Sequence, residues 1–153
     1  MPEKQTLKRA RRDAREGKAP STQAGEFVRE EIEHVREGKH GARSTKQAIA
    51  IGLSKARRAG VKLPPPRAGQ ASAETRKQAS RDVRRGRSKS SSARSSTRSR
   101  ATTRALKKEG HTAASHRALS AQAKRAARQR SPSARSEQAK RAARTRRANR
   151  SSK

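Results

Sequence analysis

The chain has 153 residues and carries 43 Lys and Arg side chains against 12 Asp and Glu, which gives a formal charge of +31. This charge favours an anionic partner, such as nucleic acid, a membrane surface or an acidic protein. Because the chain has no cysteine, disulfides, thiolate metal sites and thiol nucleophiles are excluded. No segment approaches the roughly 18 consecutive apolar residues of a membrane-spanning helix, so no membrane partner is expected. The N-terminal residues lack the apolar segment of a secretory signal, and we therefore expect a cytoplasmic protein.

Apolar residues and charges are distributed unevenly along the chain. From Arg67 to Lys153 the large apolar side chains are Val83, Leu106 and Leu119, and 27 cations stand against four acids, a net charge of +23. Such a segment cannot bury enough apolar surface to offset a backbone entropy cost of about 1–2 kcal/mol per residue. We therefore expect a mainly α-helical N-terminal part, followed over residues 67–153 by a long, largely disordered basic tail.

Residues 1–20 form the first expected segment, which is basic and helical. Leu7, Ala10 and Ala14 make only a thin apolar stripe among charged helix formers. A helix with so little to bury depends on a partner, so it is an open addition to the fold. Gly17 and Pro20 then break the pattern.

Residues 21–66 predict a helical hairpin. Ser21 or Thr22 is a suitable N-cap for the first helix, and Ser44 with Gln47 matches a capping box at the start of the second. Gly60 supplies the left-handed position after the second helix, ahead of three prolines that end the domain. The apolar positions that recur at helical spacing, and that we expect to form one small cluster, are Phe27, Val28, Ile32, Val35, Ile49 and Leu53.

The expected hairpin is only marginally stable by itself. Burial of about seven apolar side chains at roughly 1.5–3 kcal/mol each barely matches the ordering entropy of the hairpin. Completion of the core by the N-terminal helix, by a ligand or by formation of a homodimer through the hairpin is therefore expected.

The expected tail has two distinctive stretches. The Ser/Arg-rich run from Arg87 to Arg100 is typical of disorder. The sequence Gln122–Arg128 recurs identically as Gln138–Arg144, a repeat with a period of 16 residues. We expect both copies to be disordered in the free protein and helical on nucleic acid, because phosphates relieve the repulsion between their cations.

Arginine outnumbers lysine by 29 to 14, which suits bidentate contacts with phosphate. A tail that serves solubility alone is the weaker alternative, since solubility needs only a modest net charge. The residues expected to bind the phosphate backbone are Arg84, Arg85, Arg87, Lys124, Arg125, Arg128, Arg130, Lys140, Arg141, Arg144, Arg146 and Arg147.

The hairpin resembles a DNA-reading helix-turn-helix less than it does a packing or dimerisation module, because its turn is too long. Its exposed cations are secondary candidates for backbone contacts: Lys46, Lys55, Arg57 and Arg58.

Nothing in the sequence predicts an enzyme, a cofactor or a metal site. The histidines His34, His40, His111 and His116 do not follow the spacing of a metal-ligand set and are expected to be solvated. No serine lies in a nucleophile motif, and no catalytic constellation of acids and bases is visible.

The run STQAGEFVREEIEHVREGKHGARSTKQAIAIGLSKARRAGVKLPPP, from Ser21 to Pro66, resembles the core of an uncharacterised bacterial family of small basic proteins. Some members of that family carry the label of plasmid stabilisation protein. The resemblance extends from Met1 to about Pro66 and implies a bacterial cytosolic or nucleoid protein, without any catalytic residues. By composition alone, the tail resembles the Ala/Lys/Arg-rich tails of bacterial histone-like proteins and linker histones.

These observations favour a non-enzymatic, nucleoid-associated protein that binds DNA largely independently of sequence, through neutralisation of phosphates by its tail. DNA is favoured over RNA as the partner. An RNA- or ribosome-associated protein is one alternative, since A-form RNA offers the same phosphates. A protein-interaction module with a tail that tethers it to a polyanion is the other.

Overall fold

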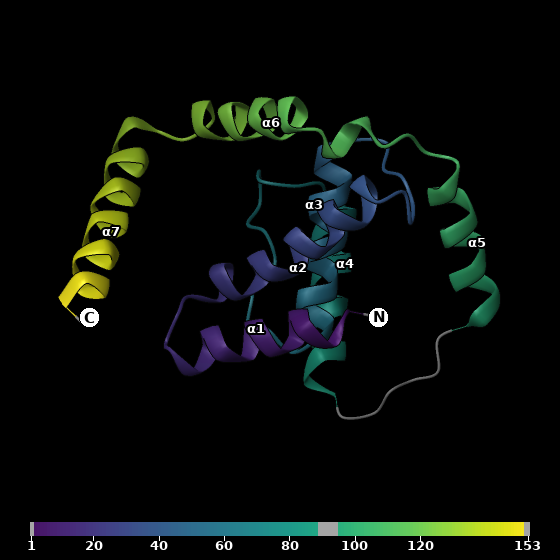
Figure 1. Ribbon diagram of the computed structural model, residues 1–153, viewed down its shortest axis with the longest axis horizontal. Coiled ribbons are helices and arrows are strands. Elements are labelled where there is room, and N and C mark those ends of the chain that lie inside the picture. Colours follow the sequence, from purple (N-terminus) through teal and green to yellow (C-terminus); the bar gives the residue numbers. More distant parts are fainter. Residues whose placement is uncertain (1, 89–94, 152–153) are drawn as a thin grey trace. The chain divides into compact units, whose positions relative to one another are not determined.

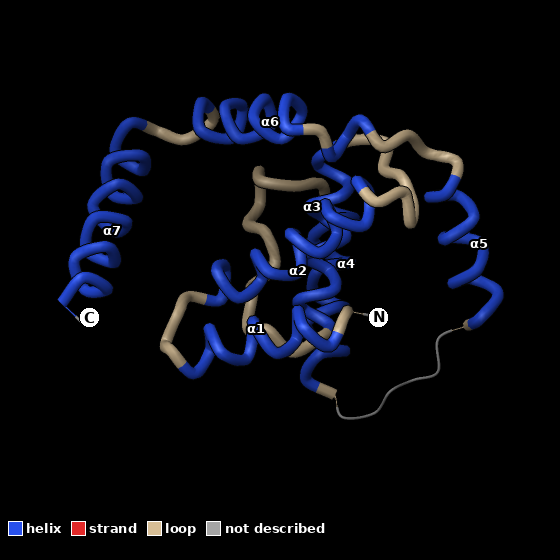
Figure 2. Tube along the Cα trace, viewed as in Figure 1, coloured by secondary structure: helices blue, strands red, loops and turns tan. Residues whose placement is uncertain are grey.

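The computed structural model describes residues 2–88 and 95–151, and within these residues every regular element is a helix (Figure 2). In chain order the elements are α1 (Lys4–Arg15), α2 (Pro20–Arg36), α3 (Thr45–Arg58), α4 (Ala73–Arg87), α5 (Ser96–Lys107), a short 3₁₀ helix η1 (Thr112–Ala114), α6 (His116–Arg128) and α7 (Pro132–Ser151). The prediction of a mainly helical protein is therefore confirmed.

The prediction of a long, largely disordered tail over residues 67–153 is wrong, because α4 to α7 all lie within that segment. Both copies of the repeat are helical in the free chain, one within α6 and the other at the centre of α7. Alanine, arginine, lysine and glutamine are strong helix formers, and here their propensity outweighs the repulsion between cations. Of the Ser/Arg-rich run expected to be disordered, residues 96–100 belong to α5, while residues 89–94 lie outside the described residues.

The chain divides into two compact units, Met1–Ser115 and His116–Lys153. In the first unit α2 and α3 form the expected hairpin, α1 packs on α2, and α4 packs on α3 (Figure 1). Of the ways in which the hairpin core was expected to be completed, the structure therefore shows the N-terminal helix. It adds α4, which the sequence analysis had assigned to the tail.

The core around Phe27 consists mainly of alanine. Phe27 is 1% exposed and clusters with Ala10, Ala24 and Ala56, and the partly buried side chains around them are Leu7, Leu53, Val61 and Leu63. The predicted cluster is therefore only partly present. Ile32 and Val35 are also buried, whereas Val28 and Ile49 are half-buried.

Glycines allow the three central helices to approach closely. A Cβ atom at Gly52 of α3 would lie 2.6 Å from the Cα atom of Val28 on α2. A Cβ atom at Gly86 of α4 would lie 2.0 Å from the carbonyl oxygen of Arg57 on α3. Because backbone atoms cannot move aside as the end of a side chain can, both positions need glycine for this packing.

The ends of α3 follow the sequence signals with one difference. The hydroxyl of Ser44 accepts a hydrogen bond from the amide of Gln47, at 3.2 Å, as the capping box predicts. The side chain of Gln47, however, accepts from the amide of Arg43 rather than from that of Ser44. At the other end Gly60 adopts a φ of +93°, and the amide of Val61 donates to the carbonyl of Ala56 at 3.1 Å, which completes a Schellman motif. Helix α2 begins at Pro20, one residue before the earlier of its two predicted caps.

The helices α4 and η1 are held to the hairpin by polar contacts and small side chains. Asp82 of α4 is 1% exposed and accepts a hydrogen bond from Ser54 of α3. In η1 the carbonyl of Ala113 accepts from the hydroxyl of Thr45 at 2.6 Å, and that of Ala114 accepts from Nε of Arg36 at 2.8 Å. Because these residues are small or polar, the pattern of large apolar residues does not predict this mode of attachment.

Candidate nucleic-acid interface

In the unit Met1–Ser115, acidic side chains neutralise many of the cations. Ten of its acids lie in ion pairs within the described part of the chain. Among them are the buried carboxylates of Glu30, Glu31 and Asp82. Most of the negative charge of the protein therefore lies in ion pairs of this unit.

The secondary candidates on α3 are mostly engaged inside this unit. Nζ of Lys55 lies 2.7 Å from Glu31 and 3.3 Å from Glu30. Arg57 is buried, and burial lowers the pKa of its guanidinium, although the charge of Asp82 opposes that effect. Arg58 is half-buried, with Nε 3.7 Å from Asp82. Lys46 is exposed, so it alone of these four cations has the expected accessibility.

The predicted residues on α4 lie at the surface. Arg84, Arg85 and Arg87 are exposed at the C-terminal end of the helix. A shallow hollow of about 650 Å³ runs along the same helix. Its lining consists of Ala73, Arg76, Lys77, Ser80, Arg81 and Arg84. Four cations around one hollow form an anion-attracting surface.

The unit His116–Lys153 holds the remaining nine predicted residues. All nine are exposed: Lys124, Arg125 and Arg128 on α6, Arg130 just after it, and Lys140, Arg141, Arg144, Arg146 and Arg147 on α7. The unit has 13 cations and one acid, Glu137, which pairs with Lys140 at 3.3 Å. None of its described side chains is buried. This unit therefore has a large excess of positive charge and no core of its own.

The cations of α6 lie on one face of the helix, whereas those of α7 lie around most of it. At about 100° per residue, the four cations of α6 fall within an arc of roughly 100°. They are Arg117, Lys124, Arg125 and Arg128. On α7 seven cations cover about two thirds of the circumference. They are Arg135, Lys140, Arg141, Arg144, Arg146, Arg147 and Arg150. Arg117 was not among the predicted residues, and its spacing of seven residues from Lys124, two helical turns, is the signal that would have added it.

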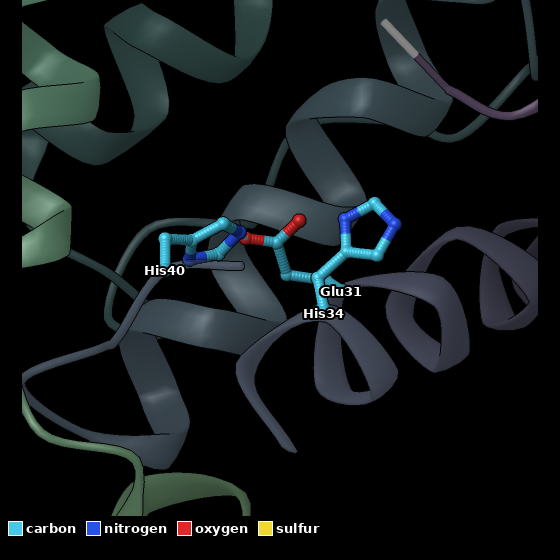
Figure 3. A group of neighbouring side chains, drawn as sticks. All are labelled: Glu31, His34 and His40. Carbon is cyan, nitrogen blue, oxygen red and sulfur yellow. Dashed lines mark ion pairs between the residues drawn. The ribbon is translucent and has the colours of Figure 1, made fainter. Parts of the chain in front are cut away.

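The histidines are not all solvated as the sequence analysis expected. His111 and His116 are exposed, but the side chains of His34 and His40 are only 13% and 15% exposed. The fold brings both of them to the buried carboxylate of Glu31, with one potential ligand atom of each residue within 4.8 Å of the others (Figure 3). Glu31 and His34 lie three residues apart on one face of α2, a spacing used by metal-binding helices, and this was the signal that the sequence analysis missed.

The chain matches a protein family over part of its length. The model of a family of unknown function (DUF6496) matches residues 4–67, which span α1, α2 and α3. No match was found among the curated proteins or among the solved structures. None of the helices in the described residues has the length and apolarity that crossing a membrane requires.

Proposed function

We propose that this protein binds DNA without catalysing a reaction, largely independently of sequence, through the exposed cations of α6, α7 and α4. In this proposal the unit Met1–Ser115 is the folded head. The unit His116–Lys153 supplies most of the affinity by placing Arg and Lys side chains on phosphates. Each such contact releases condensed counterions, which gives affinity without base recognition.

The observation that carries the proposal is the charge of the unit His116–Lys153. Its 13 cations share one carboxylate, and none of its described side chains is buried. Helices without a buried side chain contribute little to a core, and their unneutralised charge favours a partner outside the chain. A closely spaced array of phosphates is the partner that matches a stripe of arginines and lysines.

Preformed helices favour duplex DNA over RNA. The major groove of B-DNA, about 12 Å wide, admits an α-helix, whereas that of A-form RNA is deep and narrow. Helix α7 has 20 residues and is about 30 Å long, which is close to one turn of duplex. The protein has neither tyrosine nor tryptophan and buries Phe27, so it lacks aromatic platforms for unpaired bases.

Such binding suits a cytoplasmic protein associated with the nucleoid. A histone-like or plasmid-stabilising role is the physiological form that we propose, because coating of phosphates compacts DNA whatever its sequence. The family of unknown function that matches α1 to α3 adds no activity to this proposal.

The proposal is tested by comparing the full chain with a chain that ends at Ser115, where the first compact unit ends. If about ten phosphates are neutralised, the logarithm of the affinity of the full chain for duplex DNA falls with that of salt concentration with a slope near −9. The shorter chain should show a much lower affinity and a shallower slope. Equal affinities would contradict the proposal, and tighter binding of duplex RNA than of DNA would favour the RNA-associated alternative.

A further inference from the structure

Glu31, His34 and His40 belong to the head and take no part in the proposed interface. Glu31 and His34 lie on α2, and His40 lies in the turn that follows it (Figure 3). Glu31 is 0% exposed, which makes it one of the largest fully buried side chains of the protein. A buried carboxylate beside two imidazoles needs a physical explanation, because burial of a charge is costly unless it is paired and hydrogen-bonded.

The carboxylate of Glu31 lies close to an ammonium group and an imidazole but has no hydrogen bond within the described residues. Nζ of Lys55 lies 2.7 Å from its Oε2 atom, and Nε2 of His40 lies 3.3 Å from its Oε1 atom. Neither contact has the angles of a hydrogen bond. A buried polar group in this condition points to an ion or a water molecule that completes its environment.

The outer contacts of the two histidines fix which nitrogen faces the cluster. Nδ1 of His40 lies 3.0 Å from the carbonyl oxygen of Gly41, and Nε2 of His34 lies 2.9 Å from Oε1 of Glu3. Both oxygens can only accept, so both of these nitrogens carry the proton of the neutral ring. The remaining nitrogens, Nε2 of His40 and Nδ1 of His34, then present lone pairs.

Lone pairs from three residues therefore share a small space. In the neutral ring, Nε2 of His40 and Oε1 of Glu31 are two acceptors that face each other, and a cation bound between them satisfies both. Each of the three side chains is also held from outside, His34 by Glu3, His40 by Gly41 and Glu31 by Lys55 through its other oxygen. Such outer contacts orient metal ligands and fix the tautomer of each histidine.

We propose that Glu31, His34 and His40 form a binding site for a divalent transition-metal ion, with Zn²⁺ as the ion that best fits two imidazoles and one carboxylate. Coordination at about 2.0 Å in a tetrahedron places ligand atoms about 3.3 Å apart. The ligand atoms here lie within 4.8 Å of one another, so the ion draws them together by up to roughly 1.5 Å. Three protein ligands leave the fourth position to water.

The charges around the site allow a divalent cation. Glu3, Glu30 and Glu31 bring three carboxylates to its surroundings, against the ammonium groups of Lys39 and Lys55. Lys55 also contacts Glu30, so it keeps a counterion when Glu31 binds the metal through Oε1. The ion ties the end of α2 to the turn before α3 and therefore stabilises the hairpin, independently of DNA binding.

The first test titrates the full chain, freed of metal by a chelator, with Zn²⁺ by calorimetry. We expect one equivalent to bind and the unfolding temperature to rise. The double variant His34→Gln, His40→Gln should lose more than about 100-fold in affinity. The variant Glu3→Ala, which removes the outer contact of His34 together with the ion pair to Lys39, should lose about tenfold. The matched control is His111→Gln, His116→Gln, which removes two exposed histidines and should bind as the unchanged chain does. Equal losses in the two double variants, or no saturable binding by the unchanged chain, would overturn the proposal.

A second measurement uses the unchanged chain and so does not depend on whether a variant folds. In ¹⁵N spectra of the histidine rings, Zn²⁺ should shift Nδ1 of His34 and Nε2 of His40, the two nitrogens that lack the proton. The rings of His111 and His116 should not shift. Shifts confined to these two exposed histidines, or the absence of any ring shift at saturation, would show that the cluster holds no metal.

Discussion

The two units of this protein are both rich in cations, but they differ in how many of these cations are paired with acids. The unit Met1–Ser115 has 30 cations and 11 acids, and ion pairs, buried alanines and the packing of α1 to α4 hold it together. The unit His116–Lys153 has 13 cations and one acid, and none of its described side chains is buried. Its helices form because their residues favour the helix.

This comparison shows that a high positive charge does not by itself indicate either disorder or binding. In the first unit many cations are structural, as Lys55 shows through its contacts with two buried carboxylates. In the second unit one carboxylate cannot neutralise 13 cations, and the excess is available to an external polyanion. The predictions below test this division, first in the head.

The largest expected effect on stability comes from Phe27→Ala. Phe27 is 1% exposed in a small core made mainly of alanine, so its loss should cost about 3–5 kcal/mol of unfolding free energy. Urea unfolding followed by circular dichroism measures this cost. DNA binding at moderate salt should be largely retained, because α6 and α7 do not depend on this core. If the variant unfolds the head and also abolishes DNA binding, the head and not the unit His116–Lys153 supplies most of the affinity, and the division is wrong.

A smaller loss is expected from Gly52→Ala. The added Cβ atom would lie 2.6 Å from the Cα atom of Val28, so α2 and α3 must separate, at a cost of about 1–3 kcal/mol. Gly25→Ala is the matched control, because nothing lies within 4 Å of its Cβ position and alanine favours the helix by about 0.5–1 kcal/mol. Thermal unfolding of the two variants should therefore shift in opposite directions. A loss of the same size in both would show that the close approach of α2 and α3 is not what Gly52 permits.

Acid should destabilise the head through Glu30. Burial raises the pKa of Glu30, but the bonds that it accepts from the amide of Glu3 and from Thr6, with the charge of Lys55, outweigh burial and hold the pKa below its ordinary value. The ionised carboxylate therefore stabilises the fold above the unfolded pKa of about 4.3, and this stability is lost as the pH falls through the folded pKa.

The measurement for Glu30 compares unfolding free energies above and below that range. The variant Glu30→Gln should lose less stability on acidification than the unchanged chain, whereas Glu74→Gln, at an exposed acid, should behave as the unchanged chain does. An equal loss in all three proteins would show that Glu30 does not contribute to acid sensitivity.

Much of the head could be predicted from the sequence, because its signals are local. The cap at Ser44, the left-handed Gly60 and the helical spacing of Phe27 and Val35 each specify structure within a few residues. The packing of α4 on α3 could not be predicted in this way. It depends on Asp82, Gly86 and Ala79, which are short or polar residues whose role appears only when distant segments meet.

The candidate interface was predictable in position but not in conformation. The sequence placed the cations of the repeat correctly as exposed residues, yet it expected a disordered chain where α6 and α7 are formed. Disorder was expected because few large apolar side chains could offset the backbone entropy. Helix propensity and the small buried alanines Ala79, Ala113 and Ala114 contribute to order that this expectation left out. The cluster of Glu31, His34 and His40 does not follow from the spacing of the histidines alone, because its third member is an acid on the same helix face as His34.

The most direct test of the central claim removes charge equally from the two units. One variant replaces Lys124, Arg125, Arg128, Lys140, Arg141 and Arg144 by glutamine, which keeps the helices. Its control replaces six exposed cations of the head by glutamine: Lys4, Lys8, Arg11, Arg15, Lys62 and Arg67. Both variants lose six positive charges. If the unit His116–Lys153 binds DNA, the slope of log affinity for duplex DNA against log salt should become shallower by about 5 in the first variant and change little in the second. Equal changes in the two slopes would mean that only total charge matters, and that the unit His116–Lys153 is not the DNA-binding part of the protein.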